Sequence, residues 1–265
     1  MSSFTCNLAR DSSTENLDTT LRKFWEVEEY VSGPQKFTEE EQACEKHFVN
    51  NTKVDSDGKI IVRLPFKQDP TCLGESFEYS KKRFLSLERR LDRDSTLKSM
   101  YVDFMNEYMA LGHMSLYNHP LSHPHYIIPH HCVLKPQSTT TKLRVVFDGS
   151  ARTTSNHSLN DILMVGPTIQ QDLITTLFSF RLNRFALTAD ISKMYRQFLV
   201  DERDRKFQLV LWRSSKQEKL SVFQLNTVTY GLSAAPFLAI RSLFFIADQH
   251  SSNFPIGSKV LREDL

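Results

Sequence analysis

Apolar residues in the first half of the chain recur every three or four positions, which is the spacing of amphipathic helices. Between positions 76 and 111 they form two stripes, made of Phe77, Phe84, Leu87 and Leu91 and then of Tyr101, Phe104, Met105 and Tyr108. Gly112 follows the second stripe and is typical of a helix C-terminus. Thr38 and Glu41 have capping-box spacing, which predicts another helix over about 38–49.

Alternating apolar and polar residues indicate strands. The segment "KIIVRL" (59–64) follows a predicted hairpin turn at Asp57 and Gly58, and residues 206–226 predict a second hairpin. The segments "TKLRVVFDGSA" (141–151) and "FALTAD" (185–190) predict two further strands, the latter ending in a carboxylate with a buried pattern.

Two more helices are expected in the second half of the chain. The segment 166–180 carries Ile169, Leu173, Leu177 and Phe180 at helical spacing, and Pro167 is placed to start it. The segment 234–248 predicts the other helix, after the loop "TVTYGLS". These elements predict an α+β fold, with much helix in the first half and more strand after about residue 125.

Composition narrows the class of protein without identifying it. The 265 residues are 40% hydrophobic and 24% charged, with a net charge of +2, as in a soluble globular protein of one large or two smaller domains. The four cysteines are scattered and predict reduced thiols. The start has no secretory signal, and no apolar run is long enough to span a membrane, so we expect an intracellular protein, cytoplasmic or nuclear.

Two conspicuous motifs favour ordinary structure over chemistry. Five histidines and one cysteine crowd together, but their irregular, proline-interrupted spacing favours a polar surface loop over a zinc site: His119, His123, His125, His130, His131 and Cys132. "FDGS" has Asp148, Gly149 and Ser150 in the wrong order for an aspartic protease.

Four other features are open to two interpretations each. The basic face of 81–98 suits either a solvated helix or a nucleic-acid groove. Lys142 and Arg144 fall on one side of a predicted strand, as surface residues or as a triphosphate clamp. Asp190 could cap the turn after its strand or bind a metal ion, and "TYGLSAAP" (229–236) could be tight packing or a close backbone approach to a ligand.

In chain order, these pieces resemble the reverse transcriptase region of the Pol polyprotein of Pao/BEL-type LTR retrotransposons. The resemblance covers most of the chain, from about Phe24 to Ala247. It rests on "FWEVEEY", "EEQACEKHF", "SDGKIIVRLPF", "KKRFLSLERRL", "EYMALGHM", "YIIPHHCVLKP", "TKLRVVFDGSA", "SLNDILMVGPTIQQDL", "TADISKMYRQF", "FQLVLWR" and "LNTVTYGLSAAPFLAIR".

The resemblance implies right-hand polymerase fingers and an incomplete palm behind a helical N-terminal extension. The expected division is a disordered lead, an extension with a β-hairpin, fingers-like α/β and partial palm, over 1–20, 21–112, 113–186 and 187–265. The implied activity is RNA-directed DNA synthesis, with an RNA template, a DNA primer, deoxynucleoside triphosphates and Mg²⁺ or Mn²⁺.

The resemblance also implies roles for individual residues. Asp190 matches the first metal-binding aspartate, and Ile191 would add a backbone carbonyl to the metal site. Tyr195 matches the aromatic residue under the incoming sugar. The remaining matches are Arg144 and, more weakly, Lys142 at the triphosphate, Asp148 as a structural acid, Tyr230 and Gly231 at the incoming nucleotide, and Pro236 at the start of the following helix.

One departure from the family pattern bears on activity. Reverse transcriptases carry a second metal motif with two adjacent aspartates, and no adjacent pair occurs in this sequence. The final segment "SKVLREDL" resembles the stretch before that motif, and Asp264 does not replace the pair. We therefore expect a truncated fragment, without the remaining Pol regions, that binds metal weakly and is inactive by itself. The alternative is a non-catalytic nucleic-acid-binding remnant or domesticated retroelement protein that uses Lys81, Lys82 and Arg83.

Overall fold

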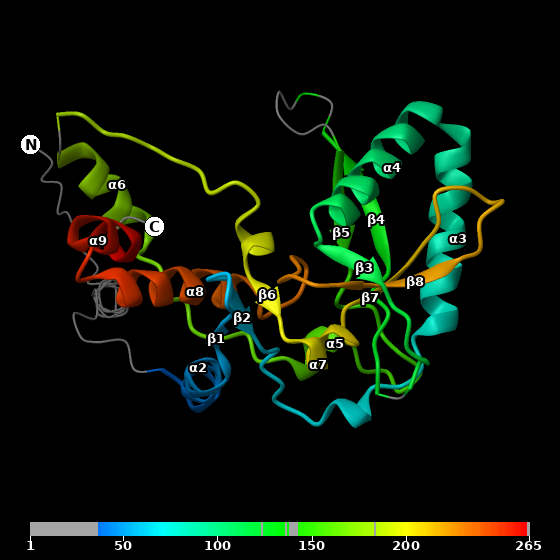
Figure 1. The fold of residues 1–265 in the computed structure, drawn as a ribbon, viewed down its shortest axis with the longest axis horizontal. Coiled ribbons are helices and arrows are strands. Elements are labelled where there is room, and N and C mark those ends of the chain that lie inside the picture. The colour runs from blue at the N-terminus through cyan, green and yellow to red at the C-terminus, as the bar shows by residue number, and fades with distance from the viewer. Residues whose placement is uncertain (1–36, 123, 136, 138–142, 183, 264–265) are drawn as a thin grey trace, which may run out of the picture. The chain divides into compact units, whose positions relative to one another are not determined.

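A computed structural model describes residues 37–122, 124–135, 137, 143–182 and 184–263, which form a mixed α+β fold (Figure 1). The described helices are α2 (Glu39–Asn51), α3 (Phe77–Arg93), α4 (Ser95–Ala110), α5 (Leu159–Ile162), α6 (Leu173–Leu182), α7 (Glu202–Arg205), α8 (Ala235–His250) and α9 (Pro255–Glu263), with 3₁₀ turns η1 (Pro70–Cys72) and η2 (Met194–Gln197). None of these helices has the length and apolarity that a membrane-spanning helix requires. The lead predicted over 1–20 lies outside the described residues.

The strands of the described residues form three small sheets. The strands are β1 (Lys53–Val54), β2 (Ile60–Val62), β3 (Met114–Leu116), β4 (His130–Leu134), β5 (Leu143–Phe147), β6 (Leu199–Val200), β7 (Leu209–Trp212) and β8 (Ser221–Leu225). Their orders are β1-β2-β6, β3-β8-β7 and β4-β5, and every pair is antiparallel except β2 with β6. The parallel pair joins strands far apart in sequence, so it ties the two halves of the described chain together.

The predicted N-terminal helix and hairpin are both confirmed. The Thr38 hydroxyl accepts from the Glu41 amide at 3.3 Å, while the Thr38 amide donates to the Glu41 carboxylate at 2.7 Å, which completes the capping box of α2. Gly58 has φ +79° in the turn between β1 and β2. A glycine tolerates this left-handed conformation without a steric penalty, which is why the turn could be predicted.

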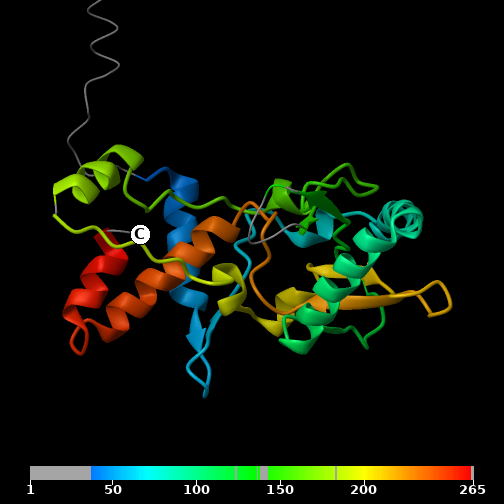
Figure 2. The same cartoon turned by 90° about the horizontal axis from the view of Figure 1, so that it is seen from above.

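The helical stretch over 76–111 is interrupted once. Asp94 has an extended backbone between α3 and α4, and its carboxylate accepts from the Leu97 amide at 2.9 Å. It thus ends one helix and caps the next, a break that the two stripes did not predict. Both helices pack beside the strands, α3 against β4 and β7 and α4 against β5 (Figures 1 and 2).

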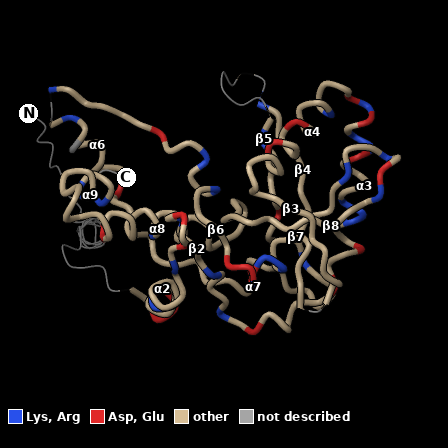
Figure 3. Tube along the Cα trace, viewed as in Figure 1, with Lys and Arg blue, Asp and Glu red and all other residues tan. Residues whose placement is uncertain are grey.

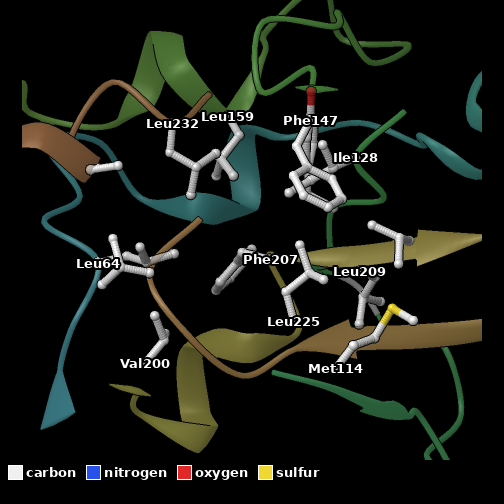
Figure 4. Close-up of a cluster of buried hydrophobic side chains, with 14 of the residues drawn as sticks. Leu64, Met114, Ile128, Phe147, Leu159, Val200, Phe207, Leu209, Leu225 and Leu232 are labelled. Atoms are coloured by element: carbon white, nitrogen blue, oxygen red, sulfur yellow. The ribbon is translucent and has the colours of Figure 1, made fainter. Parts of the chain in front are cut away.

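The buried core draws on all three sheets and the loops between them. Figure 4 shows Leu209 and Leu225 of the β7–β8 hairpin beside Phe207, with Phe147 of β5 on one side and Met114 of β3 on the other. Helix α8, confirmed close to its predicted bounds, packs its Phe237 ring against Phe48 of α2 at 6.0 Å between centroids. The predicted β5 strand and β7–β8 hairpin are also confirmed.

The predictions for residues 166–190 are partly wrong. Helix α6 begins at Leu173 and not at Pro167, since the Asp172 carboxylate accepts from the Thr175 amide at 2.8 Å and caps the helix there. The predicted strand over 185–190 has no regular structure, because no described strand pairs with it. An isolated extended segment leaves its backbone groups to water, so alternation alone cannot make it a strand.

Candidate functional site

The loop that contains Tyr230 and Gly231 lies directly against the end of β5. Gly231 has φ +97°, and a Cβ atom there would lie 2.0 Å from the Phe147 carbonyl oxygen. The Tyr230 ring packs on the Phe147 ring at 5.4 Å between centroids. Only glycine fits this backbone position, so the close approach proposed for "TYGLS" is made to the chain itself.

Asn160 of α5 joins two loops at this place. Its amide nitrogen donates to the Gly231 carbonyl at 3.0 Å and to the Ser150 hydroxyl at 2.8 Å, while its amide oxygen accepts from the Ser233 amide at 2.8 Å. Sequence reasoning missed Asn160. The capping box of Ser158 and Asp161 was a signal for α5, but nothing local indicates that the side chain between them bridges two distant segments.

Arg196 of η2 contacts α4 close to the Tyr230 loop. Its guanidinium lies 4.2 Å from the centroid of the Tyr108 ring and 3.5 Å from the Glu107 carboxylate. Burial raises the pKa of Tyr230, and the Arg196 charge opposes that rise. The hydrogen bond from Lys193 holds the pKa of Glu107 below its usual range. We call Tyr108, Phe147, Arg196, Tyr230 and Gly231 the hub.

Arg144 lies on the exposed side of β5, opposite Val133 of β4. Its charge also opposes the rise in the pKa of Tyr230, so its guanidinium acts on the hub through space. Arg144 thus lies on the same strand as Phe147, whose ring and carbonyl contact Tyr230 and Gly231. An exposed guanidinium on this strand can hold a phosphate group. Lys142 lies outside the described residues.

The residues predicted around the metal site are more dispersed. Asp190 and Ile191 are exposed in the irregular segment before η2, so the expectation of a buried acid at a strand end was wrong. Tyr195 is partly buried and packs against the core. Within the described residues, no three His, Cys, Asp or Glu side chains come together in a way that could hold a metal ion. The described donors thus do not fit a complete Mg²⁺ site.

The predicted basic face on α3 is only partly free. Arg83 lies 3.7 Å from the Asp148 carboxylate and donates to the Tyr79 hydroxyl at 3.0 Å. Lys81 pairs with Glu78 at 4.0 Å, whereas Lys82 is exposed. Asp148, predicted to be structural, links the end of β5 to α3 through this ion pair.

The histidine-rich segment is not uniformly a surface loop. His130 is buried in β4, where its Nε2 donates to the Leu211 carbonyl at 2.9 Å, leaving Nδ1 to accept from the Tyr101 hydroxyl. Burial lowers the pKa of His130 to about 4. His125 and Cys132 are buried as well, and His131 also lies on β4, so the surface-loop prediction was wrong for His125 and for the residues of β4. His123 lies outside the described residues.

Comparison with known proteins adds no assignment to this site. No family model matches the sequence, and no curated protein is significantly similar to it.

Proposed function

We propose that the chain is part of a retrotransposon reverse transcriptase of the Pao/BEL type, made of polymerase fingers and an incomplete palm, and that its hub binds the incoming nucleotide. The family activity is RNA-directed DNA synthesis on an RNA template with a DNA primer. One observation carries the proposal: the Tyr230–Gly231 loop, far from Arg144 in sequence and matched separately to a nucleotide contact, packs against the end of β5, the strand that carries Arg144. Such convergence of distant residues is what a binding site requires.

In this proposal Arg144 holds the triphosphate, and Tyr230 and Gly231 pack against the nucleotide. The planar guanidinium can donate two parallel hydrogen bonds to phosphate oxygens, and the Arg144 side chain is exposed to solvent. Tyr195 lies under the sugar and disfavours a 2′-hydroxyl by steric exclusion. Asp190 is the one metal ligand of the family pattern that the chain supplies, with the Ile191 carbonyl beside it. Since the described residues do not complete a metal site, we derive no metal-dependent step.

Nucleotide binding tests the proposal without requiring catalysis. A fluorescent deoxynucleoside triphosphate should bind the purified chain, and Arg144→Ala should weaken its affinity about tenfold or more, because a charge-assisted contact to phosphate is lost. The titration is followed by fluorescence anisotropy, with unlabelled deoxynucleotide as competitor. Tyr195→Ala should leave the deoxynucleotide bound and let a ribonucleotide compete better.

Arg152→Ala is the matched control. Arg152 also lies just after β5 and is exposed, but its guanidinium donates to Asn156 within its own loop at 3.0 Å. The Arg152→Ala substitution removes the same charge from the same region and leaves the residues of the hub unchanged. Equal affinity of the Arg144 and Arg152 variants, or no binding to the unaltered chain, would contradict the nucleotide site.

Polymerisation is a separate expectation. The sequence contains no adjacent aspartate pair, so the chain alone should give no primer extension with Mg²⁺ or Mn²⁺ on an RNA template with a DNA primer. Robust extension that Asp190→Asn abolishes would show instead that the metal site is complete without the pair.

A second candidate function is nucleic-acid binding without catalysis. Lys82, Arg89 and Arg93 are exposed and follow one stripe of α3, as the basic positions along α3 in Figure 3 illustrate. Such a stripe can follow a phosphate backbone. Binding to an RNA–DNA duplex should fall steeply with salt and be lost on charge reversal at Lys82, Arg89 and Arg93. No binding at low salt would exclude this function.

A further inference from the structure

A basic pocket lies between α7 and the segment after β3. Its volume is about 470 Å³, large enough for a nucleotide-sized ligand. Three cations and a carboxylate come from or adjoin α7, and two rings come from the other wall: Arg203, Arg205, Lys206, Glu202, Tyr117 and His119. Figure 3 shows the charged positions side by side at α7. The pocket belongs to none of the segments matched to catalysis.

The short helix that carries the cations is fixed in place by a buried acid. Asp204 has a side chain 2% exposed, accepts from the Arg63 guanidinium at 2.7 and 3.0 Å, and also accepts from the Leu64 amide at 3.0 Å. These contacts anchor α7 to the segment after β2. Its flanking cations are consequently presented on a rigid support, as a preorganised binding site requires.

The three cations differ in how far the protein itself neutralises them. Arg203 is held by the Asp201 carboxylate at 2.8 and 2.9 Å. Arg205 donates to the Val200 carbonyl at 2.8 Å, and the carboxylate nearest to it, Glu202, is 3.8 Å away and mostly in water. Burial lowers the pKa of the Arg205 guanidinium.

Of the three cations, Lys206 has the charge that the protein neutralises least. Its ammonium lies 5.2 Å from the centroid of the Phe207 ring and forms no ion pair with any described residue. The pocket therefore combines Lys206, which has no carboxylate partner among the described residues, with Arg205, whose partner Glu202 is exposed, and with Arg203, whose guanidinium is oriented by Asp201. This surplus of positive charge at one concave place favours an anionic ligand with several oxygens.

The opposite wall offers flat rings. Tyr117 and His119 pack edge to face at 5.4 Å between centroids, and the Tyr117 amide donates to the Val222 carbonyl at 2.9 Å, which fixes the start of this wall to β8. Tyr117 is half-buried and His119 is exposed. A ring of a ligand can stack on such a wall while its anionic group reaches the cations.

We propose that this pocket binds a phosphorylated nucleotide unit, with the phosphate at Arg203, Arg205 and Lys206 and the base against Tyr117 and His119. The unit can be a free nucleotide or one residue of a single strand, because both present the same phosphate and base. The site is separate from the hub. Figure 4 shows Phe147 and Leu232 on one side of the core cluster, and Val200 of β6 and Met114 of β3 on the other.

Two probes distinguish the sources of the nucleotide unit. The full chain is titrated at low salt with 5′-AMP by calorimetry and with a labelled oligo(A) strand of about ten nucleotides by anisotropy. Binding of AMP supports a free-nucleotide site, and binding of the strand alone supports a strand site. Lys206→Gln should weaken the bound probe about tenfold, and Tyr117→Ala should weaken it about five- to tenfold through lost stacking. Failure of both probes to bind overturns the proposal.

The matched control is Lys219→Gln, which removes one exposed lysine from the turn of the β7–β8 hairpin, outside the pocket. It should leave the affinity unchanged; an equal loss in the Lys206 and Lys219 variants would show a general attraction to basic surface and overturn the site. Arg144→Ala should not alter binding of either probe here. Failure of the hub proposal would appear only in the deoxynucleotide titration. Failure of the pocket proposal would appear only in the titrations of the Lys206 and Tyr117 variants with AMP and oligo(A).

Discussion

Two parts of this chain have apolar patterns in sequence, but one is buried and the other is exposed. In the hub and the core beneath it, apolar rings and side chains are buried from several directions, and Leu209 is completely buried. In the segment 173–190, apolar side chains face outward: Ile174 is 67% exposed, Phe185 79% and Leu187 95%. We call this second region the exposed apolar segment.

The contrast shows that an apolar pattern needs a partner surface before it becomes structure. Strand β5 pairs with β4 along its whole length and packs against the Tyr230 loop at its end. Its backbone and its apolar side chains therefore both have partners. Residues 185–190 have the same kind of pattern but pair with no described strand. Burial of apolar surface supplies most of the free energy that orders a chain, and it is available only where a second surface is present.

The difference in burial between the two regions can be tested by making the same substitution, Leu→Ala, in each of them. Leu209→Ala should lower the free energy of unfolding by about 2–5 kcal/mol, through lost burial and the cavity left behind. Leu187→Ala should change it by less than about 0.5 kcal/mol, because that side chain is already in water. Urea denaturation followed by circular dichroism measures both; a comparable loss at Leu187 would mean that the segment is buried in solution.

The close approach at the hub predicts the next largest effect. Gly231→Ala places a methyl group against the Phe147 carbonyl in a left-handed backbone, which should cost about 2–3 kcal/mol. Gly112→Ala is its control, since Gly112 also has φ +70° but open space around it, and should cost about 1 kcal/mol. The difference between the two midpoints in urea isolates the steric term, and equal costs would contradict the close contact.

The burial of His130 in the packed region predicts that the free energy of unfolding depends on pH. The pKa of His130 is about 4 when folded and near 6.5 when unfolded, so the unfolded chain binds more protons in between and stability falls as pH drops through that window. The loss should reach about 2 kcal/mol by about pH 5. Denaturation midpoints over this range measure it. His130→Gln should be less stable at neutral pH but flatter across the window, and an unchanged slope would contradict the assignment.

The smallest effect should come from the hub cation. Arg196→Met loses the contact with Glu107 and the stacking on Tyr108, and should cost about 1 kcal/mol. Arg181→Met, in exposed α6, removes the same charge and should cost less than about 0.5 kcal/mol. Thermal unfolding compares them. If Arg181 proves the more costly of the two, the exposed apolar segment contributes contacts that the described residues do not make.

Sequence reasoning succeeded where the signals were local. The capping box of Thr38 and Glu41, the turn at Gly58 and the stop at Gly112 each depend on a few adjacent residues, and each was found at or close to its predicted place. The hairpin formed by β7 and β8 is local in the same sense, since its strands are joined by a short turn. Such signals depend on backbone geometry and hydrogen bonds within one or two turns of chain.

Sequence reasoning failed where contacts between distant segments determine the local structure. The alternation in 185–190 predicted a strand, but the structure provides no partner for it. The histidines predicted a surface loop, yet His130 is enclosed by Tyr101 and Leu211 from distant elements. Asn160 carried no local sign of its bridge to Gly231. In each case the missing information is which surface arrives from elsewhere in the chain.

The sequence by itself therefore determined most element types, several caps and turns, and an ordered set of motifs that resembles a reverse transcriptase. Tertiary structure alone decided that the Tyr230–Gly231 loop packs against the end of β5 and that Asp190 lies exposed. It also created the basic pocket beside α7. The physical reason is that hydrogen bonds within a turn are encoded by adjacent residues, whereas burial and convergence of side chains depend on contacts between segments far apart in sequence.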